Sequence, residues 1–155
     1  MTETKTNTES TEMYLKEIYL LSRDGEPAKT GSIADRLDVS PPSVTEKLAS
    51  LEDSGFVDYE KYKGATLTSE GEETAERLLR KHCLIERFLV KFLGVEDGFH
   101  EEACRIEHVM SDNVAEELGA VVEQEPDCPS CYDPAEGHCA NLFTQSGNSM
   151  GLRTE

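Results

Sequence analysis

Apolar and polar positions alternate along the N-terminal part of the chain with the period of α-helices. Residues 12–22, EMYLKEIYLLS, repeat apolar side chains at helical spacing. Residues 32–40, SIADRLDVS, predict a short second helix that Ser32 can cap. Residues 41–54 predict a third helix, because its two prolines fit a first turn and Gly55 provides a stop. The last two helices, joined by a tight turn, form a helix-turn-helix.

The pattern then changes from the helical period to short runs typical of strands. Residues 56–67, FVDYEKYKGATL, predict a two-stranded hairpin with a turn at Gly64. Thr68 or Ser69 begins the next helix, and Glu72 follows Ser69 at the spacing of a capping box. A hairpin directly after a helix-turn-helix is the wing of a winged helix. The alternative is a small α+β unit without that role.

The second half of the chain predicts three further helices, over residues 70–93, 99–110 and 111–124. Gly94 ends the first of them, and Ser111 caps the third. Their apolar faces are too small for an independent core, so we expect them to form a homodimer interface. The fold class is therefore mainly α, with an α+β winged helix-turn-helix at the N-terminus.

The composition is strongly acidic, with 32 acidic residues against 15 basic ones and a net charge of -17. Such a charge normally argues against nucleic acid as a partner. The acids are spread along the chain rather than gathered in a tail, which is typical of a halophilic protein whose charges are screened by salt. The acidity therefore does not exclude DNA binding.

The chain has no run of 18 apolar residues and no apolar segment of a signal peptide near its start. We therefore expect a cytoplasmic protein without a membrane span. The five cysteines are an odd number, and nothing indicates export. Free thiols or metal ligands are thus expected in preference to a disulfide framework.

A helix-turn-helix places the start of its second helix in the major groove of DNA. Small hydroxyl and proline side chains in such a position can contact thymine methyls and phosphates, and lysines on a wing can contact phosphates. Each of these residues can instead be an ordinary solvated surface group. The candidate DNA contacts are Lys29, Arg36, Ser40, Pro42, Ser43, Thr45, Glu46, Lys47, Lys61 and Lys63.

Candidate metal ligands gather in the second half, in the segment EACRIEHVM and the helix before it. At about 100° per residue, His100, Cys104, Glu107 and His108 fall on one helix face roughly 100° wide. The preceding helix carries His82 and Glu86 one turn apart. Imidazole, carboxylate and sulfur ligands together fit a divalent transition metal, and sulfur favours iron over manganese. Structural zinc would need more thiolates, and calcium or magnesium only oxygens.

Several segments together resemble the diphtheria-toxin-repressor family of iron- and manganese-dependent transcriptional regulators. They are TEMYLKEIYLL, IADRLDVSPPSVTEKLASLEDSGFV, LTSEG, RKHCLIERFL and HEEACRIEHVMSD. The resemblance covers roughly residues 9–122. It implies a homodimer that binds operator DNA when loaded with Fe(II) or Mn(II). On this basis we expect three parts: a DNA-binding domain at residues 1–71, a helical metal-binding and dimerisation domain at 72–125, and a cysteine-rich tail at 126–155.

The resemblance also implies two metal sites, because the family's ligand positions carry suitable residues here. Sulfur at positions 13 and 104 is what the iron-responsive branch uses, whereas the manganese branch has carboxylates there. The alternative for Met13 is an ordinary core methionine. The implied primary site comprises Met13, Cys104, Glu107 and His108, and the implied ancillary site comprises His82, Glu86 and His100.

Two departures from the family pattern stand out. Longer members have an SH3-like domain that donates further ancillary ligands, for which these 155 residues leave no room. Water or another acid such as Glu101 would complete that site. The tail places Cys128, Cys131, His138 and Cys139 at a spacing that can hold zinc or iron, with redox-active or purely structural thiols as alternatives.

On these grounds we expect an Fe(II)-activated repressor of iron-uptake genes, without a small-molecule substrate. A manganese-responsive regulator of metal transport and a thiol- or redox-sensing DNA-binding regulator are the alternatives. A metalloenzyme would need a general base and a substrate cleft, and the chain carries no HExxH or comparable catalytic signature. An enzyme is therefore not expected.

Overall fold

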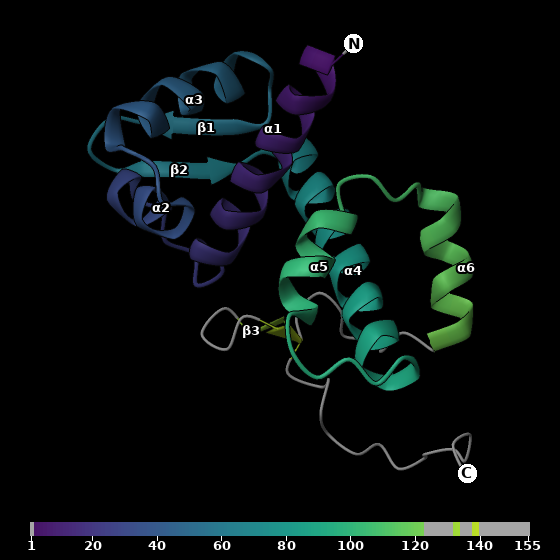
Figure 1. The fold of residues 1–155 in the computed structure, drawn as a ribbon. Helices are drawn as coiled ribbons and strands as arrows, with labels where there is room; N and C mark the ends of the chain where they lie inside the picture. The colour runs from purple at the N-terminus through teal and green to yellow at the C-terminus, as the bar shows by residue number, and fades with distance from the viewer. Residues whose placement is uncertain (1, 123–131, 134–137, 140–155) are drawn as a thin grey trace, which may run out of the picture. The chain divides into compact units, whose positions relative to one another are not determined.

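The computed structural model describes residues 2–122, 132–133 and 138–139 (Figure 1). The chain divides into two compact units, Met1–Leu79 and Arg80–Glu155. None of the helices in the described part is long and apolar enough to cross a membrane.

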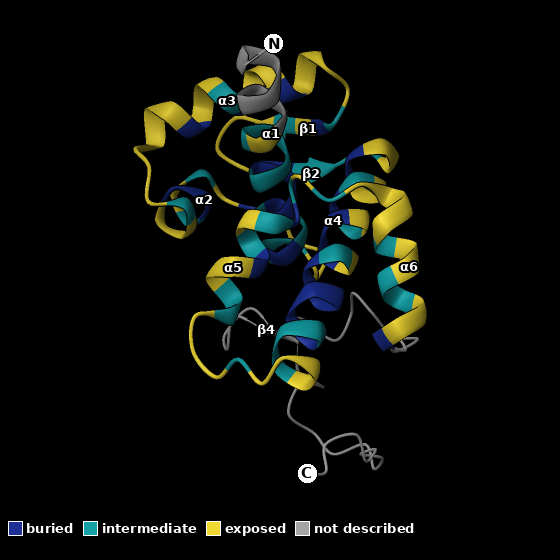
Figure 2. Cartoon of the chain, turned by 45° about the vertical axis from the view of Figure 1, so that its right-hand side comes forward, coloured by how far each residue is buried: buried dark blue, intermediate teal, exposed yellow. Residues whose placement is uncertain are grey.

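The first unit contains α1 (Thr2–Leu21), α2 (Thr30–Leu37) and α3 (Pro41–Asp53), followed by a β-hairpin. Their apolar faces meet in a single core cluster, seen as dark segments in Figure 2. This arrangement is the predicted winged helix-turn-helix. The innermost side chains, each at most 2% exposed, are Leu15, Ile18, Ile33, Val44, Leu48, Leu51, Val57 and Ala65.

The start of α1 differs from the prediction, which placed it near residue 12. The helix begins at Thr2, in a stretch of polar residues that has no apolar stripe to reveal a helix. Near the end of this stretch, the Lys47 ammonium donates to the Thr11 hydroxyl at 3.2 Å. Such a contact between distant residues is not visible in a local pattern.

Local chemistry explains where the helices of the helix-turn-helix begin and end, with one exception. Ser40 caps α3 as its side chain accepts from the Ser43 backbone N–H at 3.3 Å, ahead of prolines in the first turn. The expected cap of α2 was wrong, because Ser32 lies inside that helix. Lys29 precedes the helix and makes no side-chain cap. Asp38 ends α2 in the left-handed conformation, with φ of 55°.

The wing consists of β1 (Val57–Glu60) and β2 (Gly64–Leu67), paired antiparallel. Gly64 opens the second strand rather than forming the turn, which lies at residues 61–63. The reason is a close backbone approach: Ala28 and Ala65 exchange two hydrogen bonds of 2.9 Å. A Cβ at Gly64 would collide with the Ala28 carbonyl, and its φ of 119° also requires glycine.

Helix α4 (Ser69–Arg87) begins in the first unit and ends in the second. Thr68 caps it by accepting from the Gly71 N–H at 3.2 Å, so the capping box expected from Ser69 is not the device used. The remaining elements are η1 (Phe88–Phe92, a π-helical turn), α5 (Phe99–Ile106), α6 (Asp112–Val122), β3 (Tyr132–Asp133) and β4 (His138–Cys139).

The second unit confirms the predicted caps but shortens two helices. Ser111 caps α6 by accepting from the Val114 N–H at 3.2 Å. The helix expected over 70–93 changes to π-helical hydrogen bonding after Arg87. The helix expected over 99–110 ends at Ile106. Glu107 keeps a helical backbone conformation, with its N–H donating to the Ala103 carbonyl at 2.9 Å, and His108 lies in the turn that follows.

We predict opposite effects from adding a methyl group at two helical glycines. A Cβ at Gly71 would collide with the Phe56 carbonyl oxygen, which is held against the first turn of α4. Gly71→Ala should therefore lower the free energy of unfolding by about 1–3 kcal/mol. Gly31→Ala in α2 meets nothing within 4 Å, so it should be neutral or stabilise by up to about 1 kcal/mol.

Chemical denaturation of the two variants and the parent chain is the measurement. Equal stability of Gly71→Ala and Gly31→Ala would contradict the close contact at Gly71.

Candidate metal centre and nucleic-acid interface

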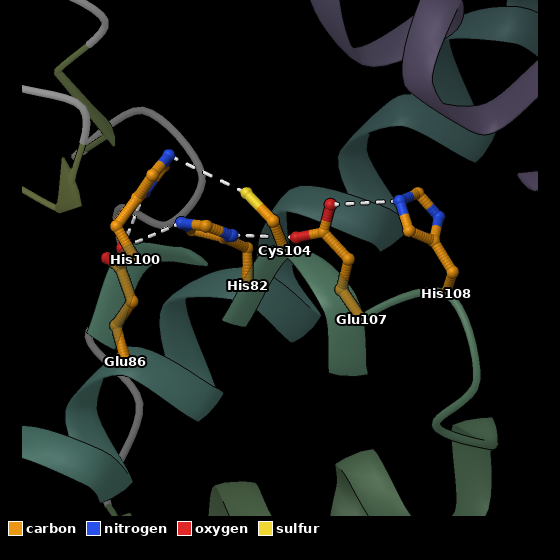
Figure 3. A network of polar contacts seen from close by, with 6 residues as sticks. All are labelled: His82, Glu86, His100, Cys104, Glu107 and His108. Atoms are coloured by element: carbon orange, nitrogen blue, oxygen red, sulfur yellow. Dashed lines mark hydrogen bonds and ion pairs between the residues drawn. The ribbon is translucent and has the colours of Figure 1, made fainter. Parts of the chain in front are cut away.

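Six side chains of the second unit meet in one polar network (Figure 3). Helix α4 contributes His82 and Glu86, and α5 contributes His100 and Cys104. In each pair the residues are four positions apart, which places them on one helix face. Glu107 and His108 complete the network from the segment that follows α5.

His82 lies at the middle of this network, between two carboxylates. Its Nδ1 is 2.6 Å from Glu107 Oε1, and its Nε2 is 2.7 Å from Glu86 Oε2. The side chains of all three residues are completely buried. Buried carboxylates are costly unless they are paired. An ionised carboxylate can only accept, so the His82 ring donates from both nitrogens and carries the compensating charge.

The network continues on both sides of this central triad. On one side, His100 Nδ1 is 3.1 Å from Glu86 Oε2, and its Nε2 is 3.6 Å from Cys104 Sγ. On the other side, His108 Nε2 is 3.5 Å from Glu107 Oε2. The His108 side chain is 3% exposed, whereas that of His100 is 34% exposed. The His100 end is thus the accessible end of the network.

The surrounding groups shift the protonation of both histidines in the same direction. Burial by itself lowers the pKa of His82, but hydrogen bonds with Cys104 and both carboxylates outweigh it and raise that pKa well above 6.5. For His100, the hydrogen bonds with Cys104 and then Glu86 outweigh burial and raise the pKa to about 9. Without metal, both imidazoles hold protons at neutral pH.

The structure brings six of the seven implied metal ligands together, but not as two separate sites. Glu107 of the implied primary site contacts His82 of the implied ancillary site. The ligand atoms of His82, His100 and Cys104, which belong to both implied sets, lie within 4.8 Å of one another. Two imidazoles and a thiol fit a divalent transition metal.

Met13, the seventh implied ligand, lies on α1 in the first unit and is half-buried. Its role as a metal ligand, or as a core methionine, stays a prediction.

The candidate DNA contacts of the first unit are mostly exposed. Two of them have partners that limit their freedom: Arg36 Nε is 2.7 Å from Glu17 Oε1, and Lys47 is partly buried against Thr11. The exposed ones are Lys29, Arg36, Ser40, Pro42, Ser43, Thr45, Glu46, Lys61 and Lys63.

Sequence reasoning missed Tyr62 at the tip of the wing. Its side chain is 89% exposed, and its φ of 70° is unusual for any residue other than glycine or asparagine. The Lys61 ammonium lies 5.4 Å from the centre of its ring. An aromatic residue between two lysines, just before the turn predicted at Gly64, was the available signal.

The cysteine-rich tail lies largely outside the described residues. Cys128 and Cys131 are not among them. His138 and Cys139 form β4, whose backbone pairs antiparallel with β3, with Cys139 opposite Tyr132. The metal clamp predicted for these four residues stays a prediction.

Comparison with known proteins finds family models that match both units. Residues 7–65 match the model of the iron dependent repressor N-terminal DNA binding domain. Residues 68–133 match that of the iron dependent repressor metal binding and dimerisation domain. An uncharacterised HTH-type transcriptional regulator from Methanocaldococcus jannaschii is 42% identical over 118 residues, covering 75% of this chain and 94% of the relative.

Some relatives are matched over only about half of their length. The diphtheria toxin repressor of Corynebacterium jeikeium is 39% identical over 117 residues, which cover 75% of this chain but only 49% of the relative. The solved structure of the manganese regulator SloR superposes with a TM-score of 0.67 at 39% identity, over 77% of this chain and 56% of that one. The chain therefore belongs to the iron-dependent repressor family, whose members are metal-dependent, DNA-binding transcriptional regulators and not enzymes.

Proposed function

We propose that this chain is an Fe(II)-activated repressor of iron-uptake genes that binds operator DNA in the cytoplasm as a homodimer. The observation that carries the proposal is the ligand network of the second unit, on a chain whose first unit is a winged helix-turn-helix. A network with only a structural role would not need an imidazole that is 34% exposed, that of His100, beside the Cys104 thiol at one end.

The choice of iron rests on sulfur. Cys104 Sγ lies at the accessible end of the network, and Met13 offers a thioether. Sulfur ligands favour iron over manganese. The manganese regulator SloR is a structural relative, so a manganese-responsive regulator remains the second candidate. An Fe(II) against Mn(II) titration, read by DNA binding, separates the two.

Regulation would follow from the division of the ligands between the two units. Met13 belongs to the helix that packs in the DNA-binding core, since its neighbours Tyr14 and Leu15 are buried there. Glu107 and His108 belong to the second unit. A bound divalent ion would supply a common coordination point for these side chains. Metal that binds more tightly to the DNA-competent arrangement must raise DNA affinity by the same factor by which DNA raises metal affinity. The corresponding coupling free energy is about 1–3 kcal/mol.

Dimerisation is supported by apolar side chains that the second unit leaves exposed. They are 46–59% exposed, although large apolar residues usually lie inside. Two of them recur two turns apart on α6, as in a helix that packs against a partner. A second copy of the chain would cover them. These residues are Phe92, Leu93, Val109, Val114 and Val121.

The first prediction concerns metal-dependent DNA binding. Operator duplexes are enriched from a random pool with the Fe(II)-loaded chain under anaerobic conditions, and affinity is measured with and without Fe(II). Met13→Ala and Glu107→Ala should each lose most of the gain in affinity that Fe(II) confers, a factor of about 5–150. Glu102→Gln on exposed α5 is the matched control and should keep it. Unchanged metal dependence in both test variants would refute the proposal.

The second prediction concerns pH, because an imidazole must lose its proton to bind metal. The pKa of His100 is about 9 in the metal-free chain. Apparent Mn(II) affinity should therefore rise about tenfold per pH unit for each released proton below about pH 9, and level off above it. Calorimetric titration at several pH values measures it, and a flat profile would contradict the protonated network.

Stability of the metal-free chain should change in the opposite direction. The folded-state pKa of His100, about 9, lies above the usual 6.5, so folding takes up a proton between these values. The stabilising contribution is complete below about pH 6.5 and is lost as pH rises through about 9. Denaturant unfolding should show this fall in the parent chain and a smaller one in His100→Gln.

The third prediction concerns the wing. Lys61 and Lys63 are exposed. Lys63 forms a surface ion pair with Glu60 at 3.1 Å, and such exposed pairs contribute little free energy. Replacing either lysine with alanine should weaken binding to operator and unrelated duplexes alike, and reduce the salt dependence by about one phosphate contact. Arg77→Ala in α4 is the matched control for losing an exposed cation. Equal losses in all three variants would mean that only net charge matters.

A further inference from the structure

We propose that a single Zn(II) ion binds to His82, His100 and Cys104 together. This set takes ligands from both metal sites implied by the family resemblance. The proposal rests on the proposed function in one respect only, namely that these residues bind metal. It adds a second binding mode, in which Cys104 pairs with the two histidines and not with Met13, Glu107 and His108.

The geometry supports this mode at the accessible end of the network. Cys104 Sγ and His100 Nε2 are 3.6 Å apart. A tetrahedral zinc with Zn–N of about 2.0 Å and Zn–S of about 2.3 Å separates such ligand atoms by about 3.5 Å. The ligand nitrogen of His82 lies within 4.8 Å of both atoms. With Nε2 of His82 held by Glu86, its Nδ1 would bind the ion, releasing its proton and giving up the hydrogen bond with Glu107. Figure 3 shows that Glu107 lies between this group and His108.

Glu86 has a different role in this mode from the one that the resemblance implies. Its Oε2 lies 2.7 Å from His82 Nε2 and 3.1 Å from His100 Nδ1. Metal-binding histidines commonly donate their other ring nitrogen to a carboxylate, which orients the ring. With Nδ1 of His100 held by Glu86, its Nε2 faces Cys104. Glu86 is then a positioning residue for both imidazoles and not a ligand.

The ligand chemistry favours zinc over iron and manganese at this position. Zinc binds imidazole nitrogen and thiolate sulfur, and sites with three protein ligands leave a fourth position open to water. Zinc also binds nitrogen and sulfur ligands more tightly than Fe(II) or Mn(II) in the general order of affinities. The His100 side chain is 34% exposed, which gives an ion access at this end.

This mode has a regulatory consequence. Cys104 cannot serve both ligand sets at the same time, so an ion held by His82, His100 and Cys104 withdraws the thiolate from the set that includes Met13. Zinc bound in this way would engage only the second unit. It would therefore occupy the chain without linking its two units, and would inhibit the response to iron.

Co(II), a spectroscopic substitute for zinc, tests which partners Cys104 takes. The full chain with Cys128, Cys131 and Cys139 changed to serine removes the tail thiols. In this background, the cobalt–thiolate charge-transfer band is recorded during titration and disappears in Cys104→Ser. The band should be lost, or its affinity reduced more than about 100-fold, in His100→Ala and His82→Ala. It should persist in His108→Ala and Met13→Ala.

Two further variants sharpen the test. Glu86→Gln should keep the band with affinity reduced about 10–100-fold, as expected for a residue behind the ligands. Glu102→Gln on the exposed side of α5 should change nothing. Circular dichroism of each variant confirms folding, and a variant that fails to fold is replaced by His100→Gln or His82→Gln.

The outcomes separate this proposal from the proposed function. A band that depends on His108 and not on His100 would overturn the mixed mode, while Fe(II)-dependent operator binding would still stand. Absence of any Cys104-dependent band would also overturn it. A band that requires both His82 and His100 supports the mixed mode. Inhibition of Fe(II)-dependent operator binding by zinc would support it further, whichever metal is the physiological signal.

Discussion

The second unit depends on the neutralisation of two buried carboxylates. Glu86 and Glu107 are each at most 1% exposed, and His82 lies between them within hydrogen-bonding distance of both. Ionised carboxylates in such an environment need a cation or several donors. Without metal, protons on the imidazoles supply that charge. With metal, an ion can supply it, so the groups that stabilise the metal-free fold are the groups that metal must take over.

His82 joins the two implied sites into one network, because it contacts a carboxylate of each. A carboxylate without its ion turns to the nearest donor, and the nearest donor of Glu107 is His82, a residue of the other implied site. Metal binding at either position must therefore break hydrogen bonds that the other position uses. The two positions are coupled through shared partners, with no need for a distant conformational pathway.

How much could be predicted from the sequence depends on whether the determining contacts are local. The prolines in the first turn of α3 and the placing of His82 and Glu86 on one helix face both act within about one helical turn, and the structure confirms them. Three features were missed because no local sequence pattern signals them. Helix α1 begins among polar residues, and Gly64 is a strand residue because Ala28 approaches it.

The third missed feature is the course of the chain after α5. Treating residues 100–108 as one helix put four ligands on one face, whereas the helix ends at Ile106. The sequence therefore indicated which side chains of the second unit lie close together, but not which of them pair, and their role as metal ligands stays a prediction. A helical wheel ranks residues by angle and cannot show that Cys104 turns towards His100 while Glu107 turns towards His82. That difference matters chemically, because the partner of a thiolate determines which metal it helps to select.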